Sequence, residues 1–161
     1  ASDVYKRQDG DYQNIKTINS VGTSSWTDSS VKTGKTYYYK IKTVVKTQNG
    51  EQTSGFSNVK SAKAVPAKTT LKAKASDAKN VKLTWSKVKG ASGYEIYRSN
   101  SKDGKYSKVK TISKGSTTSY KNGKLKKSTT YYYKIRAYRK VNGKKVYGSY
   151  SSVVSVKTKA K

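Results

Sequence analysis

Apolar and polar residues alternate along several short stretches of the chain, and the clearest examples lie between residues 71 and 85. Residues 71–75 (LKAKA) and 81–85 (VKLTW) place an apolar residue at every second position. A period of two is the period of a β-strand, whose successive side chains point to opposite faces of a sheet. The same alternation predicts further strands at 94–97, 106–112, around Tyr120, at 131–138 and at 153–158. Asn142-Gly143 predicts a hairpin before the last strand, and no segment has the periodicity of an amphipathic helix.

The hexapeptide TYYYKI occurs twice, at 36–41 and 130–135, and a larger unit recurs around it. The further matches are DGDYQNIKTI (9–18) with DGKYSKVKTI (103–112), TSSWTD (23–28) with TTSYKN (117–122), and QNGEQTSGFSNV (48–59) with VNGKKVYGSYSSV (141–153). The stretch 71–99 has no counterpart before Asp9. We therefore predict two repeated units, the first of which has lost its first three strands.

Seven short predicted strands in about 100 residues favour an immunoglobulin-like β-sandwich. Residues 66–161 also resemble a fibronectin type III domain over its full length. The resemblance rests on VKLTW (81–85), GYEIYRS (93–99), the spacing from Leu125 to Tyr131, and TYYYKIRAY (130–138) before a Gly-containing hairpin. Residues 9–64 resemble the back half of the same domain. The predicted fold class is all-β, with a partial domain of four strands at 9–64, a short linker at 65–69 and a complete domain at 70–161.

Residues 1–8, ASDVYKRQ, differ from the rest of the chain. They resemble the in-frame translation of a transposase adapter used in DNA sequencing, GCG TCA GAT GTG TAT AAG AGA CAG. We therefore expect this segment to be adapter-derived and to lie outside the fold, and the native protein to continue upstream of Asp9. The alternative is a genuine segment that matches by chance, and the coding DNA decides between the two.

The three tyrosines of the repeated hexapeptide divide between the two faces of a strand. Side chains at every second position from Tyr131 should face the core, and those between them should face outward. By the family resemblance, the hydroxyl of Tyr131 bonds to the backbone upstream, and Tyr37 has the same role in the first unit. The predicted core residues are Leu83, Trp85, Tyr94, Ile96, Leu125, Tyr131, Tyr133, Ile135 and Ala137, with Tyr37, Tyr39 and Ile41 in the first unit.

The outward-facing positions form a candidate binding stripe. Its residues are Tyr97, Tyr132, Lys134, Arg136 and Tyr138, which we expect to be exposed beside Glu95. Aromatic rings interleaved with cations can stack on sugar rings or bases. The alternative is a solvated sheet face that is stabilised only by cross-strand pairs.

Composition excludes most catalytic and metal-binding chemistry. The chain has no Cys, His or Met, so it offers neither thiolate nor imidazole ligands and no imidazole base. Its 8 acidic residues are scattered and form no carboxylate pair suited to glycoside hydrolysis. A Ser–Lys dyad needs a buried Lys, and no Lys occupies a clearly inward position. We expect no enzyme activity, no metal and no cofactor, and no apolar run reaches the roughly 20 residues of a membrane span.

The 36 basic residues give a net charge of +28, which points to an anionic partner. Only four of them are Arg, and Lys lacks the planar fork that recognises phosphates and base edges. This balance argues against specific recognition of a nucleic acid.

The family resemblance implies a non-catalytic spacer and interaction module of a bacterial extracellular or cell-wall-associated protein, joined to other domains of the same parent protein. The charge favours an anionic cell-wall polymer or acidic polysaccharide as partner. Two alternatives remain: a carbohydrate-binding module that uses the stripe, and a non-specific nucleic-acid binder. We also predict that 66–161 folds alone and that 9–64 does not, because the inward face of 36–41 would be partly uncovered.

Overall fold

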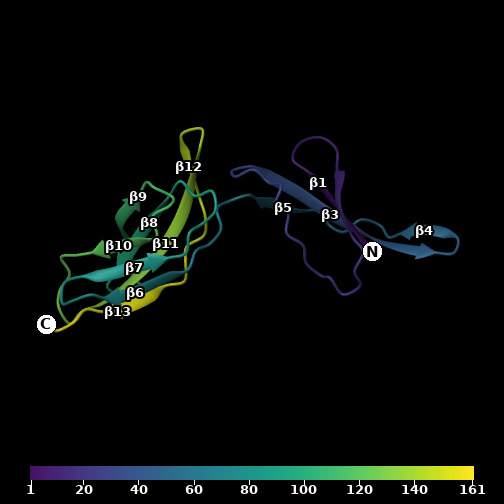
Figure 1. The fold of residues 1–161 in the computed structure, drawn as a ribbon. Coiled ribbons are helices and arrows are strands. Elements are labelled where there is room, and N and C mark those ends of the chain that lie inside the picture. The colour runs from purple at the N-terminus through teal and green to yellow at the C-terminus, as the bar shows by residue number, and fades with distance from the viewer. The chain divides into compact units, whose positions relative to one another are not determined.

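The computed structural model describes all 161 residues and contains β-strands but no helix (Figure 1). The expectation of an all-β fold is therefore confirmed. The strands are β1 (Ser2–Arg7), β2 (Gln13–Ile18), β3 (Thr36–Thr47), β4 (Gly50–Thr53), β5 (Lys60–Lys63), β6 (Leu71–Ala75), β7 (Val81–Trp85), β8 (Gly93–Ser99), β9 (Ser107–Ile112), β10 (Ser119–Asn122), β11 (Thr130–Val141), β12 (Lys144–Tyr147) and β13 (Val154–Lys157). The chain divides into unit 1 (Ala1–Ala64) and unit 2 (Val65–Lys161).

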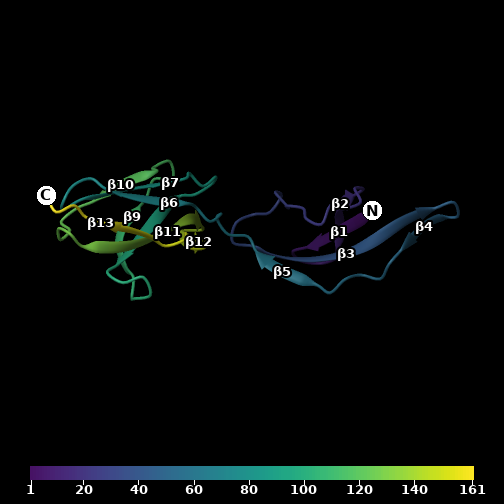
Figure 2. The same cartoon turned by 90° about the horizontal axis from the view of Figure 1, so that it is seen from below.

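Unit 2 is a sandwich of two antiparallel sheets (Figure 2). One sheet has the order β10-β7-β6, and the other has the order β12-β11-β8-β9, with β13 also paired to β11. The bounds of β6 and β7 coincide with the two clearest alternating stretches of the sequence. Strand β11 is longer than predicted because it runs into the hairpin at Asn142-Gly143, where φ is 48 and 76 degrees, as a tight hairpin turn requires.

The facing sides of the two sheets enclose the core of unit 2. The rings of Trp85 and Tyr94 meet there with centroids 5.4 Å apart. The buried residues are Leu71, Val81, Leu83, Trp85, Val88, Tyr94, Ile96, Leu125, Tyr131, Tyr133, Ile135 and Ala137. All nine residues of unit 2 that were predicted to lie in the core are among them. Full burial of one such large side chain contributes about 1.5–3 kcal/mol, so this core stabilises the sandwich.

Unit 1 contains one sheet instead of two. Its order is β2-β1-β3-β4, with β5 also paired to β3, and this repeats the order β9-β8-β11-β12 and β13 of unit 2. The second sheet of unit 2, formed by β6, β7 and β10, has no counterpart in unit 1. Residues 19–35, which include the segment that corresponds to β10, contain no strand.

Strand β1 lies inside the sheet of unit 1, which corrects the expectation that residues 1–8 lie outside the fold. β1 pairs with β2 on one side and with β3 on the other. Val4 lies opposite Ile41, just as Ile96 lies opposite Ile135 in unit 2, so β1 takes the position of β8. Strand β2, which would lie at the edge of the sheet without a neighbour if residues 1–8 were absent, therefore has β1 as its partner. The coding origin of residues 1–8 stays a prediction.

The inner face of unit 1 is open because no second sheet covers it. A hollow of about 680 Å³ lies on this face, with Val4, Tyr37 and Trp26 among its lining residues. Ile41, expected in the core, is 47% exposed, whereas the equivalent Ile135 is fully buried. Tyr37 is buried and Tyr39 is half-buried, because the loop of residues 19–35 covers only part of the face.

The boundary between the units falls before the segment that we expected to be a linker. Residues 65–69 are counted with unit 2, and Pro66 and Thr69 are buried. The Thr69 hydroxyl donates a hydrogen bond of 2.6 Å to the Ser86 carbonyl, which ties the segment to the end of β7.

Candidate binding face

The predicted stripe lies on the face of the β12-β11-β8-β9 sheet that points away from the core, which we call the outer face. Tyr132, Lys134 and Arg136 of β11 are half-buried there instead of exposed. Tyr97 of β8 pairs with Lys134 across the two strands and is also half-buried. The structure therefore brings these four predicted residues together, but other side chains partly cover them.

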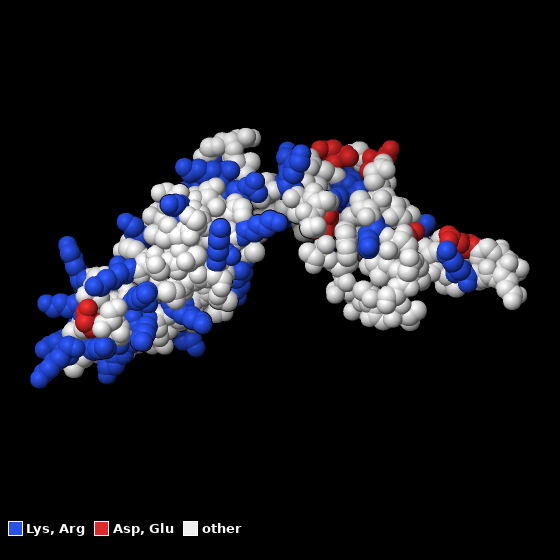
Figure 3. Space-filling view, in the orientation of Figure 1, with Lys and Arg blue, Asp and Glu red and all other residues white.

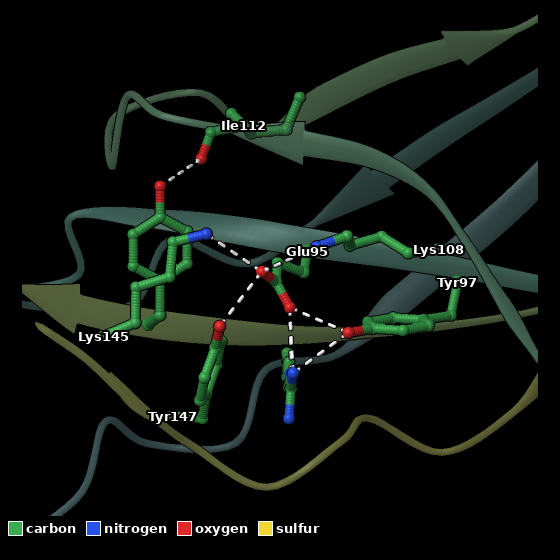
Figure 4. A network of polar contacts seen from close by, with 8 residues as sticks. Glu95, Tyr97, Lys108, Ile112, Lys145 and Tyr147 are labelled. Carbon is green, nitrogen blue, oxygen red and sulfur yellow. Dashed lines mark hydrogen bonds and ion pairs between the residues drawn. The ribbon is translucent and has the colours of Figure 1, made fainter.

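Tyr138, the fifth predicted residue, is buried with 1% of its surface exposed, so the expectation that it is exposed is wrong. Its partner across the strands is Gly93, which has no side chain to occupy the space. A Cβ atom at Gly93 would lie 2.6 Å from the Tyr138 hydroxyl oxygen. The Tyr138 hydroxyl donates a hydrogen bond of 3.3 Å to the Ile112 carbonyl (Figure 4). The ring is thus accommodated beside Gly93 and held by β9.

Glu95 is at the centre of the outer face, although it was expected only as a neighbour of the stripe. It is 1% exposed and accepts hydrogen bonds from cations and hydroxyls on three other strands and its own (Figure 4). The donors to Oε2 are Arg136 Nη2 at 2.9 Å and the Tyr97 hydroxyl at 2.8 Å, and those to Oε1 are Lys145 Nζ at 3.0 Å, the Tyr147 hydroxyl at 3.2 Å and Lys108 Nζ at 3.4 Å. These donors satisfy a carboxylate that would be costly to bury alone.

The charges around Glu95 fix its ionisation. Burial alone would raise the pKa of Glu95, but the hydrogen bonds from Arg136, Lys145 and Tyr97 outweigh burial and lower the pKa to about 2. Burial and the hydrogen bond to the carboxylate raise the pKa of Tyr97. Glu95 is therefore ionised and Tyr97 is neutral at physiological pH, so the carboxylate can organise the cations around it.

Cations and aromatic rings alternate across the outer face. Lys134 Nζ lies 4.4 Å from the ring centroid of Tyr106 and 4.3 Å from that of Tyr150. The Arg136 guanidinium lies 3.6 Å from the ring centroid of Tyr147 and 4.9 Å from that of Tyr150. A cation that contacts a ring in this way contributes about 0.5–2 kcal/mol, depending on how far it is desolvated. The rings therefore hold the cations in fixed positions.

We call this alternation of cations and aromatic rings the cation–ring ladder. Unit 1 repeats the ladder with equivalent residues. Lys40 Nζ lies 4.3 Å from the ring centroid of Tyr12 and 3.7 Å from that of Phe56, as Lys134 does between Tyr106 and Tyr150. Tyr5 and Phe56 meet edge to face at 5.0 Å, and Tyr97 and Tyr150 do so at 5.3 Å. The ladder thus belongs to the repeated unit, whereas the carboxylate centre with its five donors is found in unit 2.

The outer face is cationic and carries few free rings. The one negative charge of Glu95 is outnumbered by three cations that pair with it. Tyr132 has no cation against its ring, so a carbohydrate platform on this face would depend on Tyr132. The structure gathers no group of three or more Asp, Glu, His or Cys that could hold a metal ion.

Sequence reasoning missed several residues of the face. Glu95 was the detectable one, because it is one of three acidic residues in unit 2 and lies opposite Arg136 in the pairing of β8 with β11. Tyr147 and Tyr150 follow the hairpin at Asn142-Gly143, and the alternation of β11 does not say where that segment folds. Their contacts with Arg136 became visible only in the structure.

Unit 2 has an immunoglobulin-like β-sandwich fold of the kind found in fibronectin type III domains. The chain is similar to the crystal structure of the FN1–FN3 domains of chicken CNTN1, with a TM-score of 0.51 and 20% identity over 98% of this chain and 56% of that one. The chain thus spans little more than half the length of that structure. It is also similar to the solution structure of the 6th fibronectin type III domain from human fibronectin type III domain containing protein 3, with a TM-score of 0.51 and 18% identity over 62% of this chain and 92% of that one.

A third similar structure is that of a Fn3-like protein from Clostridium thermocellum, with a TM-score of 0.48 and 29% identity over 59% of this chain and 92% of that one. No protein-family model matches the sequence, and no curated protein matches it. The structure has no helix that is long and apolar enough to cross a membrane.

Proposed function

We propose that the chain is a non-catalytic fibronectin type III module of a bacterial extracellular or cell-wall-associated protein. In this proposal it acts as a spacer and interaction domain, and its lysine-rich surface holds anionic polymers of the wall. The rigid sandwich supplies the spacing, and the charge supplies sequence-independent attraction. The fold supports the module, and the charge distribution supports the class of partner.

The distribution of charge between the units is the observation that carries the proposal. Unit 1 has 10 basic and 5 acidic residues, and unit 2 has 26 and 3, which leaves net charges of +5 and +23. Figure 3 shows Lys and Arg side chains spread over the visible face of unit 2, while acidic side chains gather mainly over unit 1. Of the three acidic residues in unit 2, Glu95 is already paired with cations. A polyanion would therefore be attracted mainly to unit 2.

The proposal predicts that the full chain is retained on an immobilised anionic wall polymer at low salt and released at high salt. Multiple Lys contacts release counterions, so the logarithm of the affinity should fall linearly with the logarithm of the salt concentration. The measurement is retention on purified wall polymer as sodium chloride rises from about 0.05 M to about 1 M, where the Debye length falls to roughly 3 Å.

A neutral polysaccharide on the same support is the matched control, and the chain should pass over it without retention. Retention on the anionic polymer that does not change with salt would remove the charge-based part of the proposal.

A further inference from the structure

The two units differ at one largely enclosed polar position, where a cation and a tyrosine hydroxyl contact an acidic side chain in unit 1 and an amide in unit 2. In unit 1, Asp28 accepts hydrogen bonds from Lys6 Nζ at 2.8 Å and from the Tyr39 hydroxyl at 2.9 Å. In unit 2 the equivalent residue, 94 positions later, is Asn122. Its Oδ1 accepts hydrogen bonds from Arg98 Nη1 at 3.2 Å and from the Tyr133 hydroxyl at 2.8 Å.

The strand pairing shows that the two cations are also equivalent. Lys6 of β1 lies opposite Tyr39, and Arg98 of β8 lies opposite Tyr133. Lys6 therefore forms an ion pair with a carboxylate, whereas Arg98 occupies the same place next to a neutral amide. No acidic side chain forms an ion pair with Arg98.

Arg98 is positioned even though its charge is not neutralised. Its guanidinium lies 5.1 Å from the ring centroid of Tyr131, and one of its five N–H groups is used by Asn122. The side chain loses little further freedom when it binds, and it is half-buried, so part of the guanidinium stays accessible to a ligand. A planar fork of this kind is suited to two parallel hydrogen bonds with an oxyanion.

Arg98 lines an open polar hollow of about 630 Å³ between the end of β8 and the loop that precedes β11. The other lining residues are Asn100, Lys124, Lys126, Ser128, Thr129, Thr130 and Tyr131. The hollow thus combines three cations with several hydroxyl groups and contains no carboxylate.

The loop on the rim of this hollow holds two residues in the left-handed backbone region. Lys124 has a φ of 58 degrees and Ser128 has a φ of 52 degrees. The residue of unit 1 that corresponds to Ser128 is Gly34, with a φ of 89 degrees, which has no side chain to strain. Unit 2 therefore retains a hydroxyl-bearing residue where its repeat has glycine, and such conformations cluster at functional sites.

We propose that Arg98, Lys124 and Lys126 form a binding site for an oxyanion group of an acidic polymer, and that Asn122, in place of the carboxylate that Asp28 provides in unit 1, leaves this site open in unit 2. The inference rests on the proposed function, because it names where on unit 2 the polymer is held. Phosphodiester and carboxylate polymers share the required chemistry, so the experiment includes one polymer of each kind.

The test gives unit 2 the carboxylate that unit 1 has at the equivalent position. In Asn122→Asp, made in the full chain, the new carboxylate should form an ion pair with Arg98 as Asp28 does with Lys6. Arg98 would then be neutralised and no longer attract an oxyanion. Asn142→Asp is the matched control, since it makes the same change from +28 to +27 at an exposed hairpin turn that accepts Asp. We expect Asn122→Asp to weaken binding to poly(glycerol phosphate) or to polygalacturonate about tenfold or more, and Asn142→Asp less than about twofold.

A second pair of variants keeps the test decisive if Asn122→Asp does not fold. Lys124→Gln combined with Lys126→Gln removes two exposed cations of the hollow, and Lys72→Gln combined with Lys74→Gln removes two exposed cations of β6. Only the first pair should weaken binding beyond the effect of the charge. In addition, titration of the wild-type chain with inorganic pyrophosphate should shift the NMR signal of the Arg98 side-chain N–H.

The outcomes separate the site from the general function. Equal losses in the hollow variants and their controls, with no shift at Arg98, would overturn the site while leaving a diffuse polyanion surface in place. Failure of the wild-type chain to bind either polymer at low salt would overturn the proposed function and the site together. The polymer that the wild-type chain binds more tightly identifies the source of the oxyanion.

Discussion

The tyrosines of the repeated hexapeptide have different roles that follow from single hydroxyl contacts. The Tyr131 hydroxyl accepts a hydrogen bond of 3.0 Å from the Lys126 N–H, and the Tyr37 hydroxyl accepts one of 3.0 Å from the Lys32 N–H. In both units this contact spans five residues and fixes the loop that leads into the long strand. Tyr132 lies on the other side of β11, and no hydrogen bond involves its hydroxyl. Neighbouring positions of the same residue type are therefore energetically distinct.

Replacement of Tyr131 by Phe should lower the free energy of unfolding of unit 2 by about 1–2 kcal/mol, because the Lys126 N–H loses its acceptor in a partly buried place. Tyr132→Phe is the control and should change the free energy by less than about 0.5 kcal/mol. Chemical denaturation of the full chain followed by tyrosine and tryptophan fluorescence measures both. Equal effects of the two substitutions would show that the hydroxyl contact does not stabilise the loop.

The stability of unit 2 should depend on pH through Glu95. Its pKa is lowered from an ordinary value of 4.5 to about 2, so its contribution is fully present above about pH 5 and is lost as the pH falls toward 2. Glu95→Gln should cost about 2–3 kcal/mol at neutral pH, with an upper limit set by the pKa difference and reduced by the partial exposure of the cations. The difference between wild type and variant should shrink as the pH is lowered through this range.

Asp103→Asn removes an exposed carboxylate and serves as the control for net charge. Thermal unfolding at several pH values measures the effect. A Glu95→Gln penalty that is the same at pH 7 and at pH 2.5 would mean that the ionised carboxylate is not its source.

At the scale of the elements, the close approach of β8 and β9 depends on the absence of a side chain at Gly93. A Cβ atom at Gly93 would lie 2.0 Å from the Ile112 carbonyl oxygen of β9, as well as close to the buried Tyr138 hydroxyl. Backbone atoms cannot move aside as the end of a flexible side chain can. Gly93 is therefore what allows β9, β8 and the Tyr138 ring to approach one another.

Gly93→Ala should destabilise unit 2 by about 2 kcal/mol or more, because either the strand or the ring must shift. Gly55→Ala is the control, since a Cβ atom there would meet nothing within 4 Å. Hydrogen exchange of the β8 and β9 amides should be faster in Gly93→Ala and unchanged in Gly55→Ala. Unaltered exchange in Gly93→Ala would show that the approach is looser than these distances indicate.

The strands and the exposure of their side chains differ in how well they can be predicted from the sequence. Strands β6 and β7 were predicted to the residue, because one face of each is buried and the other is solvated, which produces a clean alternation. The alternation also gave the correct face for Tyr138, but not its exposure. Exposure on the outer face depends on distant segments, such as the one that carries Tyr147 and Tyr150, and on the absence of a side chain at Gly93. A periodic pattern carries no information about either.

Strand β1 was missed for a different reason. Residues 1–8 resemble an adapter sequence, and this resemblance argues against counting them in the repeat although their pattern matches unit 2. Residues 3–6 (DVYK) and 95–98 (EIYR) have the same order of acidic, aliphatic, aromatic and basic side chains. This match predicts a strand that pairs with β3 as β8 pairs with β11.

At the scale of the whole molecule, the two units differ in how much apolar surface they enclose. Unit 2 buries its core between two sheets, whereas unit 1 presents the equivalent face without a covering sheet. A sheet needs a packed face to be stable independently. Unit 2 thus has what an autonomous domain requires, and unit 1 does not.

We therefore predict that residues 65–161 fold alone and give sharp, dispersed amide NMR signals, whereas residues 1–64 give the narrow dispersion of a largely unfolded chain. A fragment of residues 9–64, which lacks β1, should be still less ordered than 1–64 because β2 loses its partner. Well-dispersed signals from the 1–64 fragment would show that one sheet and its loop are sufficient.

The open face of unit 1 also determines how the protein should be handled. Two chains in water would bury these apolar faces if they associated through them. The electrostatic repulsion between molecules with a net charge of +28 opposes this association. Added sodium chloride weakens the repulsion but leaves the attraction between the faces in place, so concentrated stocks should turn cloudy as salt is raised. A soluble polyanion that competes for the lysines should therefore release the protein from an anionic support with less aggregation than concentrated sodium chloride.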